Sequence, residues 1–250
     1  MTLDLTTLFG AVAAVLLAAF LKGIVGFGFP TTSTLLLALF LDVRIAVALV
    51  IIPNIVMDGV QMARRGHVLQ TAQRLAVTLA TGAVGIVAGT WLLVLLPAWV
   101  ATLVLGVFTL AFVALNATPF TPRLGPEWER PLAPAAGFVS GIVGGLTNTP
   151  GTTLVIFFYA LGFPKEEFIR SIAVSFVVFK AVQLGAVAHF GLMSWGLFTV
   201  SLGLTGVALI GFYGGLRVQD RLDQRSFNRA VLAFLALLGC WLVFRSLAGR

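Results

Sequence analysis

Long apolar runs separated by short polar turns are the feature of this sequence that most limits its fold. Most of them approach or exceed the roughly 20 residues that a helix needs to span a bilayer. The runs are Leu5–Leu21, Ile45–Met62, Leu75–Leu96, Ala98–Leu115, Phe168–Phe190, Leu192–Leu216 and Phe227–Phe244. Only 10% of the 250 residues are charged, whereas a soluble domain has about 25%. The sequence therefore predicts an all-α polytopic membrane protein, and it excludes a soluble domain, a disordered chain and a nucleic-acid binder.

Two stretches rich in glycine, threonine and proline interrupt the apolar pattern, at Gly23–Thr34 and Gly141–Thr153. A short apolar run follows each one, and the run from Thr31 to Leu41 is too short to cross about 30 Å of hydrocarbon as a helix. Irregular backbone at membrane depth is tolerated only where protein buries it or where it lines a wet cavity. We therefore expect broken helices at both places, which either cross the membrane in two pieces or re-enter it.

The order of long runs, break and short run is the same in both halves of the chain, as in the repeats from which secondary transporters are commonly built. The matching glycines are Gly23 and Gly26 with Gly141 and Gly144, 118 positions later, and Gly66 and Gly89 with Gly191 and Gly214, 125 positions later. The pattern predicts a first membrane repeat at 1–117, a Pro-rich linker at 118–134 and a second repeat at 135–250. The alternative is chance similarity between glycine-rich apolar stretches.

Basic residues indicate the orientation, because they collect in cytoplasmic loops. If each half has five segments, twelve of the sixteen Lys and Arg residues lie on connections that face one side. They are Lys22, Arg64, Arg65, Arg74, Arg123, Arg130, Lys165, Arg170, Arg217, Arg221, Arg225 and Arg229. An odd number of segments inverts the second repeat, places the linker in the cytoplasm and leaves both termini in the periplasm. Re-entrant breaks give the same result.

The residues of the two breaks are suited to binding an anion. A proline near a first helical turn, with Ser, Thr or Asn around it, predicts a helix start, and the free N–H groups and positive dipole of such a start attract anions. The predicted substrate-binding residues are Gly26, Gly28, Pro30, Thr31, Thr32, Ser33, Gly144, Thr147, Asn148 and Thr149. The alternative is a glycine-mediated helix crossing whose hydroxyls bond their own backbone.

Lys180 completes the predicted binding site. It lies in the middle of an apolar run, where an ionisable group is costly and needs a partner or a wet cavity. It contacts the anion in this hypothesis; the alternative is a side chain that extends to the membrane surface.

Four polar residues are candidates for coupling or for lining the cavity: Asn54, Asp58, Gln61 and Gln183. Asp58 and Gln61 match Lys180 and Gln183, 122 positions later. Asp58 therefore either pairs with Lys180, sets its charge or relays a proton. The further alternative is an ion pair with Arg64 or Arg65 at the membrane boundary.

Residue patterns for catalysis are missing from the membrane runs. They hold no carboxylate pair, no His/Cys metal cluster and no phosphate-binding loop, and Cys240 is the only cysteine. The sequence predicts a protein that is not an enzyme and that needs neither a metal nor a cofactor.

The chain resembles the sulfite exporter TauE/SafE family of membrane transporters. The resemblance lies in the two breaks, KGIVGFGFP and SGIVGGLTNTPGTTL, and in the turns at Gly66 and Gly191. It implies transport of sulfite, sulfonates or related organosulfur anions across the bacterial inner membrane. The site that it implies lies at Gly26–Thr32 and Gly144–Thr149.

The expected function is alternating-access transport of a small sulfur oxyanion, bound between the two half-helix starts with Lys180 supplying charge. Its expected partners are that anion and membrane lipid. One competing function is a passive anion channel built on the same breaks. Another is a membrane assembly factor that binds a partner through the arginine-rich loop at Arg217–Arg229.

Overall fold

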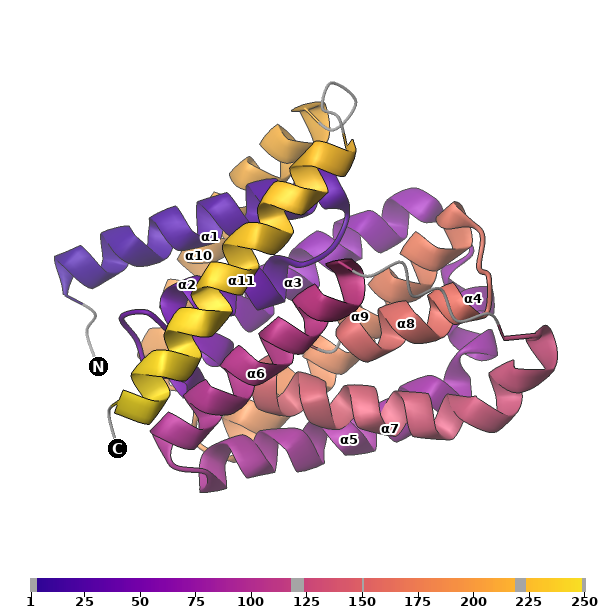
Figure 1. Cartoon of the computed structure of the whole chain (residues 1–250), viewed down its shortest axis with the longest axis horizontal. Coiled ribbons are helices and arrows are strands. Elements are labelled where there is room, and N and C mark those ends of the chain that lie inside the picture. Colours follow the sequence, from indigo (N-terminus) through magenta and orange to yellow (C-terminus); the bar gives the residue numbers. More distant parts are fainter. Residues whose placement is uncertain (1–3, 118–123, 150, 219–223, 249–250) are drawn as a thin grey trace.

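The computed structural model describes residues 4–117, 124–149, 151–218 and 224–248, and every regular element in these ranges is a helix. Figure 1 shows the helices as one elongated bundle. They are α1 (Leu5–Val25), α2 (Phe29–Leu37), α3 (Val43–Arg65), α4 (Val68–Arg74), α5 (Ala76–Leu95), α6 (Ala98–Ala117), the 3₁₀ turn η1 (Pro126–Trp128), α7 (Glu129–Thr147), α8 (Gly151–Ala160), α9 (Lys165–His189), α10 (Trp195–Val218) and α11 (Gln224–Ala248). The all-α prediction is confirmed.

Six helices of the described residues are long and apolar enough to cross a membrane: α1, α3, α5, α6, α9 and α10. The described part of α11 adds a shorter apolar helix, Leu232–Ala248. Large apolar side chains such as Trp195, Ile210 and Leu237 are more than 70% exposed on the outside of the bundle, where lipid would cover them. These observations support a multi-pass membrane protein.

Glycines set the closest helix contacts of the bundle. Helix α1 packs along α10, and α5 packs along α7. A Cβ added to Gly23 in α1 would collide with the carbonyl oxygen of Phe212 in α10, and one added to Gly141 in α7 would collide with that of Gly82 in α5. Within each of these two helix pairs, contacts further along one helix involve residues further along the other. The two helices of each pair are therefore parallel. Small residues allow this close backbone approach.

One end of the bundle carries the start of α1 and the end of α11, and we call it the termini end (Figure 1). Arg44 at the start of α3 donates from Nε to the Leu93 carbonyl oxygen near the end of α5, over 3.2 Å. Arg245 near the end of α11 donates from Nη1 to the Ala38 carbonyl oxygen just after α2, over 3.1 Å. The ends of α2, α5 and α11 therefore lie together with the start of α3.

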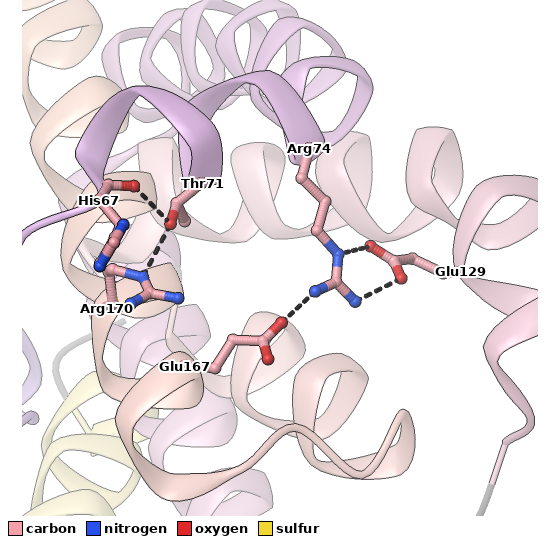
Figure 2. A network of polar contacts seen from close by, with 6 residues as sticks. All are labelled: His67, Thr71, Arg74, Glu129, Glu167 and Arg170. Atoms are coloured by element: carbon pink, nitrogen blue, oxygen red, sulfur yellow. Dashed lines mark hydrogen bonds and ion pairs between the residues drawn. The ribbon is translucent and has the colours of Figure 1, made fainter.

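The opposite end carries α4 (Figure 1) and a polar network (Figure 2), and we call it the α4 end. Arg74 donates to both carboxylate oxygens of Glu129 at the start of α7, each over 2.7 Å, and also pairs with Glu167 in α9. The hydrogen bonds to Glu129 raise the pKa of Arg74. Arg170 donates from Nε to Thr71 Oγ1 in α4, over 2.8 Å. Side chains of α4, α7 and α9 are thus tied together here.

Helices α1 and α2 flank the first break, and α7 and α8 flank the second. In each pair, the second helix returns to the end of the bundle at which the first helix begins. Gly10 near the start of α1 lies beside the ring of Phe40, just after α2. In the second half, Leu124 shortly before α7 donates its N–H to the Ala160 carbonyl oxygen at the end of α8, over 2.8 Å. The first pair opens at the termini end and the second at the α4 end, so both breaks lie between the two ends.

The last part of the stretch predicted as a linker, 118–134, is helical in the structure. Helix α7 begins at Glu129 and includes Pro131 and Pro134. Pro131 lies in the first turn, where a helix has no partner for the backbone N–H, so its missing donor is tolerated there. Pro134 lies deeper and removes one helical hydrogen bond. The short helix α4 was not predicted.

Three sequence predictions fall partly outside the described residues. These are Pro150 of the second break, positions 118–123 of the linker, and positions 219–223 of the arginine-rich loop.

Candidate functional site

The first break is built from two left-handed glycines. Helix α1 ends at Val25, and Gly26 follows with φ +92° while its N–H bonds the Lys22 carbonyl oxygen over 2.7 Å. Gly28 has φ +94° and precedes α2, which carries Pro30 in its first turn. Side chains with a Cβ disfavour this left-handed region. Gly26, Gly28 and Pro30 therefore interrupt the helix where the sequence predicts.

The second break uses an asparagine where the first uses glycine. Helix α7 ends at Thr147, and Asn148 follows with φ +63° while its N–H bonds the Gly144 carbonyl oxygen over 2.9 Å. Asparagine tolerates this conformation better than most residues. Gly144, the sequence match of Gly26, remains helical, so α7 runs one turn further than the match implies. The break consequently brings an amide side chain into the interior.

The two breaks are in direct contact through Asn148. Its Nδ2 donates to Thr34 Oγ1 of α2 over 2.8 Å, and its Oδ1 accepts from Lys180 Nζ of α9. Lys180 also donates to Gln183 Oε1 over 2.6 Å. All four side chains are buried. The structure thus buries the side chain of Lys180 against the second break, and the alternative of a side chain that extends to the membrane surface was wrong.

Two glutamines make the same contact in the two halves. Gln61 of α3 donates from Nε2 to the Gly26 carbonyl oxygen over 3.0 Å. Gln183 of α9 donates from Nε2 to the Gly144 carbonyl oxygen over 3.3 Å. Both residue pairs are matched in the sequence, at 122 and 118 positions. The sequence match and the contact therefore agree in the two halves of the chain.

Asp58 pairs with Lys22, a residue that the sequence predicts to lie on a connection between membrane segments. Lys22 Nζ donates to Asp58 Oδ1 and, over 3.3 Å, to Asn54 Oδ1. Lys22 is 1% exposed and Asp58 is 2% exposed. The predicted ion pairs of Asp58 with Arg64, which is exposed, and with Lys180 were both wrong; the side chain of Arg65 lies outside the described residues. Helix α1 continues to Val25, so Lys22 lies inside the bundle, one turn before the break.

Several predicted hydroxyl donors bond their own chain segment instead of facing a shared pocket. Ser33 donates to the Phe29 carbonyl oxygen over 2.6 Å, and Thr147 to the Val143 carbonyl oxygen over 2.7 Å. The hydroxyls of Thr147 and Thr149 also bond each other. The alternative of hydroxyls that bond their own backbone therefore describes Ser33 and Thr147. Thr31 and Thr32 are buried at the start of α2.

The polar atoms that remain suggest what the centre can bind. An ammonium has three N–H donors, and Lys22 and Lys180 each use two within the described residues. In the same part of the structure, Asn54 Nδ2, Asp58 Oδ2 and Gln61 Oε1 have no hydrogen-bond partner. The described residues hold no group of three or more His, Cys, Asp or Glu side chains suited to a metal ion. Within the described residues the centre therefore offers both unused N–H donors and unused oxygen acceptors.

The comparison with protein-family models decides the family. The model described as "Sulfite exporter TauE/SafE" matches residues 11–242, nearly the whole chain and both breaks. The chain belongs to the TauE/SafE family. No curated protein and no solved structure matches it. Membership makes this chain a membrane transport protein related to sulfite exporters, and the resemblance stated from the two breaks is confirmed.

Proposed function

We propose that this TauE/SafE protein is a secondary transporter that moves a small sulfur oxyanion, sulfite or an organosulfonate, across the bacterial inner membrane. The observation that carries the proposal is the contact between the two breaks at Asn148 and Thr34, beside the buried ammonium of Lys180. Oxyanions bind well to N–H donors with positive charge in a desolvated site. The remaining N–H donors of Lys22 and Lys180 and the start of α2 supply this chemistry.

The anion site in this proposal differs in part from the one predicted from sequence. Lys180, Asn148, Thr31 and Thr32 keep the role of contacts, together with the backbone around Gly26 and Gly28. Lys22 joins them. Ser33, Thr147 and Thr149 shape the breaks through their own hydrogen bonds, and Gly144 acts through its carbonyl oxygen.

The fold in this proposal consists of two inverted repeats with re-entrant breaks. Helices α1 and α7, which open the two halves, start at opposite ends of the bundle, and each break turns back toward its own end. The matched contacts of Gln61 and Gln183 support the same relationship. Such repeats place substrate sites at their interface near the middle of the membrane.

Charge supports a cytoplasmic location for the α4 end. Arg74 and Arg170 lie in the network of the α4 end, and Arg64 and Arg130 lie next to it at the end of α3 and the start of α7, whereas Arg44 and Arg245 lie at the termini end. Positive residues favour the cytoplasm. Both termini would then be periplasmic. Alternating access in this arrangement loosens the Arg74 network when the α4 end opens and the Arg44 and Arg245 contacts when the termini end opens.

The test of the function is transport by the purified chain alone. Reconstituted into liposomes, it should take up radiolabelled sulfite or a small sulfonate with saturation, and accumulate it when a proton or sodium gradient is imposed. Saturable flux without accumulation under any imposed gradient would favour the passive channel. No flux of any sulfur oxyanion in correctly folded proteoliposomes would reject transport and favour the assembly factor.

A further inference from the structure

Three charged side chains are buried where the breaks meet, and no other charged side chain of the described residues is classed as buried. Lys22, Asp58 and Lys180 are 1%, 2% and 0% exposed, and Lys180 interacts electrostatically with both of the others. With two ammonium groups and one carboxylate ionised, the cluster carries one net positive charge. An isolated net charge in a desolvated interior is unfavourable, and these three side chains do not balance one another's charge.

The excess charge is located at Lys180. Asp58 forms an ion pair with Lys22, whereas the bonds of Lys180 within the described residues go to the neutral amide oxygens of Asn148 and Gln183. The second carboxylate oxygen of Asp58, Oδ2, has no hydrogen-bond partner among the described residues. Its negative charge is therefore offset only in part, and it opposes the approach of additional negative charge to the cluster.

We propose that Asp58 makes this centre selective for monoanions over dianions. The inference rests on the proposed anion site and concerns the charge of its substrate. A ligand of charge −1, such as a sulfonate with an uncharged substituent, brings the cluster to neutrality. A dianion leaves one buried negative charge uncompensated beside Asp58, which is disfavoured in a low-dielectric site. Asp58 acts here as a specificity-determining residue without being required to touch the ligand.

The experiment compares two sulfur oxyanions of similar size that keep a fixed charge near neutral pH. Binding of methanesulfonate, charge −1, and sulfate, charge −2, is measured by calorimetric titration of the full-length protein in detergent at matched ionic strength. The native protein should bind methanesulfonate at least about tenfold more tightly than sulfate. Asp58→Asn raises the cluster charge to +2, so this preference should fall by about tenfold or reverse.

Two further variants keep the test decisive if Asp58→Asn does not yield folded protein. Asn54→Asp is nearly isosteric, and Asn54 Oδ1 already accepts a hydrogen bond from Lys22. It brings the cluster to zero net charge, so the affinity for methanesulfonate should fall by about tenfold or more. Asp42→Asn is the matched control, because Asp42 caps α3 at the termini end and asparagine caps helices equally well. It should leave both affinities unchanged.

The outcomes separate this inference from the proposed function. If the native protein binds both anions with equal affinity, or if folded Asp58→Asn or Asn54→Asp binds them as the native protein does, charge selection by Asp58 is wrong while the anion site stands. If the native protein binds neither these anions nor sulfite, the anion site itself is wrong.

Discussion

Asn148 of the second break donates a hydrogen bond to Thr34 of the first half-helix, across 2.8 Å and 114 positions of sequence. The same side chain accepts from Lys180. Its backbone has the left-handed conformation that ends α7. One residue therefore ends a helix, joins the two halves and holds the buried ammonium in place.

These roles of Asn148 can be separated by substitution. Asn148→Gly retains the left-handed backbone at no steric cost but removes the side-chain bonds to Thr34 and Lys180, so we expect a folded protein whose affinity for the transported anion falls by about tenfold. Asn148→Ala removes the same bonds and adds about 1–2 kcal/mol of backbone strain. It should therefore be less stable than Asn148→Gly in thermal unfolding. Equal anion affinity in Asn148→Gly and the native protein would exclude the side chain from the site.

The ion pair between Lys22 and Asp58 predicts a strongly non-additive pair of substitutions. Removing one partner leaves an uncompensated buried charge, which typically costs about 3–5 kcal/mol. Lys22→Met or Asp58→Leu alone should therefore lower the unfolding temperature markedly. The double variant, which buries no charge at either position, should recover most of that loss. Independent, additive losses in the double variant would show that the two residues do not form a buried pair.

The glycine contact between α5 and α7 predicts that Gly141 tolerates no side chain. A Cβ at Gly141 would collide with the Gly82 carbonyl oxygen, so Gly141→Ala should destabilise the protein by about 1–3 kcal/mol through helix separation. Gly203 in α10 has no atom within 4 Å of an added Cβ. Gly203→Ala is thus the matched control and should be neutral or slightly stabilising. Similar unfolding temperatures for the two variants would contradict the packing of α5 against α7.

The Arg74 network predicts a local rather than a global effect. Its pairs with Glu129 and Glu167 are partly exposed, and exposed ion pairs contribute about 1 kcal/mol or less. Arg74→Gln should therefore leave the unfolding temperature nearly unchanged. Hydrogen exchange should nevertheless become faster in α4 and at the start of α7, because the side chain joins them. The exposed Arg64→Gln serves as the control; equal exchange in both variants would show that the Arg74 network does not hold the α4 end together.

The sequence was most informative where a rule of backbone chemistry applies locally. A glycine-rich interruption and a proline suited to a first helical turn identified the break at Gly26–Pro30, and the structure adds the left-handed backbone of Gly26 and Gly28. Lys180 was identified as buried because it lies ten residues from the nearest charged neighbour in its run. Both features depend on short stretches of chain and need no knowledge of the tertiary contacts.

The burial of Lys22 and the register between the two halves depend on tertiary contacts, and the sequence did not predict them correctly. Lys22 follows a long apolar run, so its position is typical of a residue at the membrane boundary. The apolar residues Gly23–Val25, which continue α1, were the signal that Lys22 lies inside the bundle. The equivalence of Gly89 with Gly214 at 125 positions also differs from the structure. In the structure, Gly23 contacts Phe212 and its sequence match Gly141 contacts Gly82. These contacts make Gly82 equivalent to Phe212, 130 positions later. Glycines are frequent in both helices, so residue identity alone could not set their register.

The most direct test of the central claim, that the two breaks and Lys180 form an anion site, is equilibrium binding of radiolabelled sulfite to the purified protein. The native chain should bind it saturably, and Lys180→Gln should weaken binding by about tenfold or more. Arg64→Gln, which removes an exposed charge at the α4 end, should bind as the native chain does. Equal binding by a folded Lys180→Gln protein and the native chain would contradict the account.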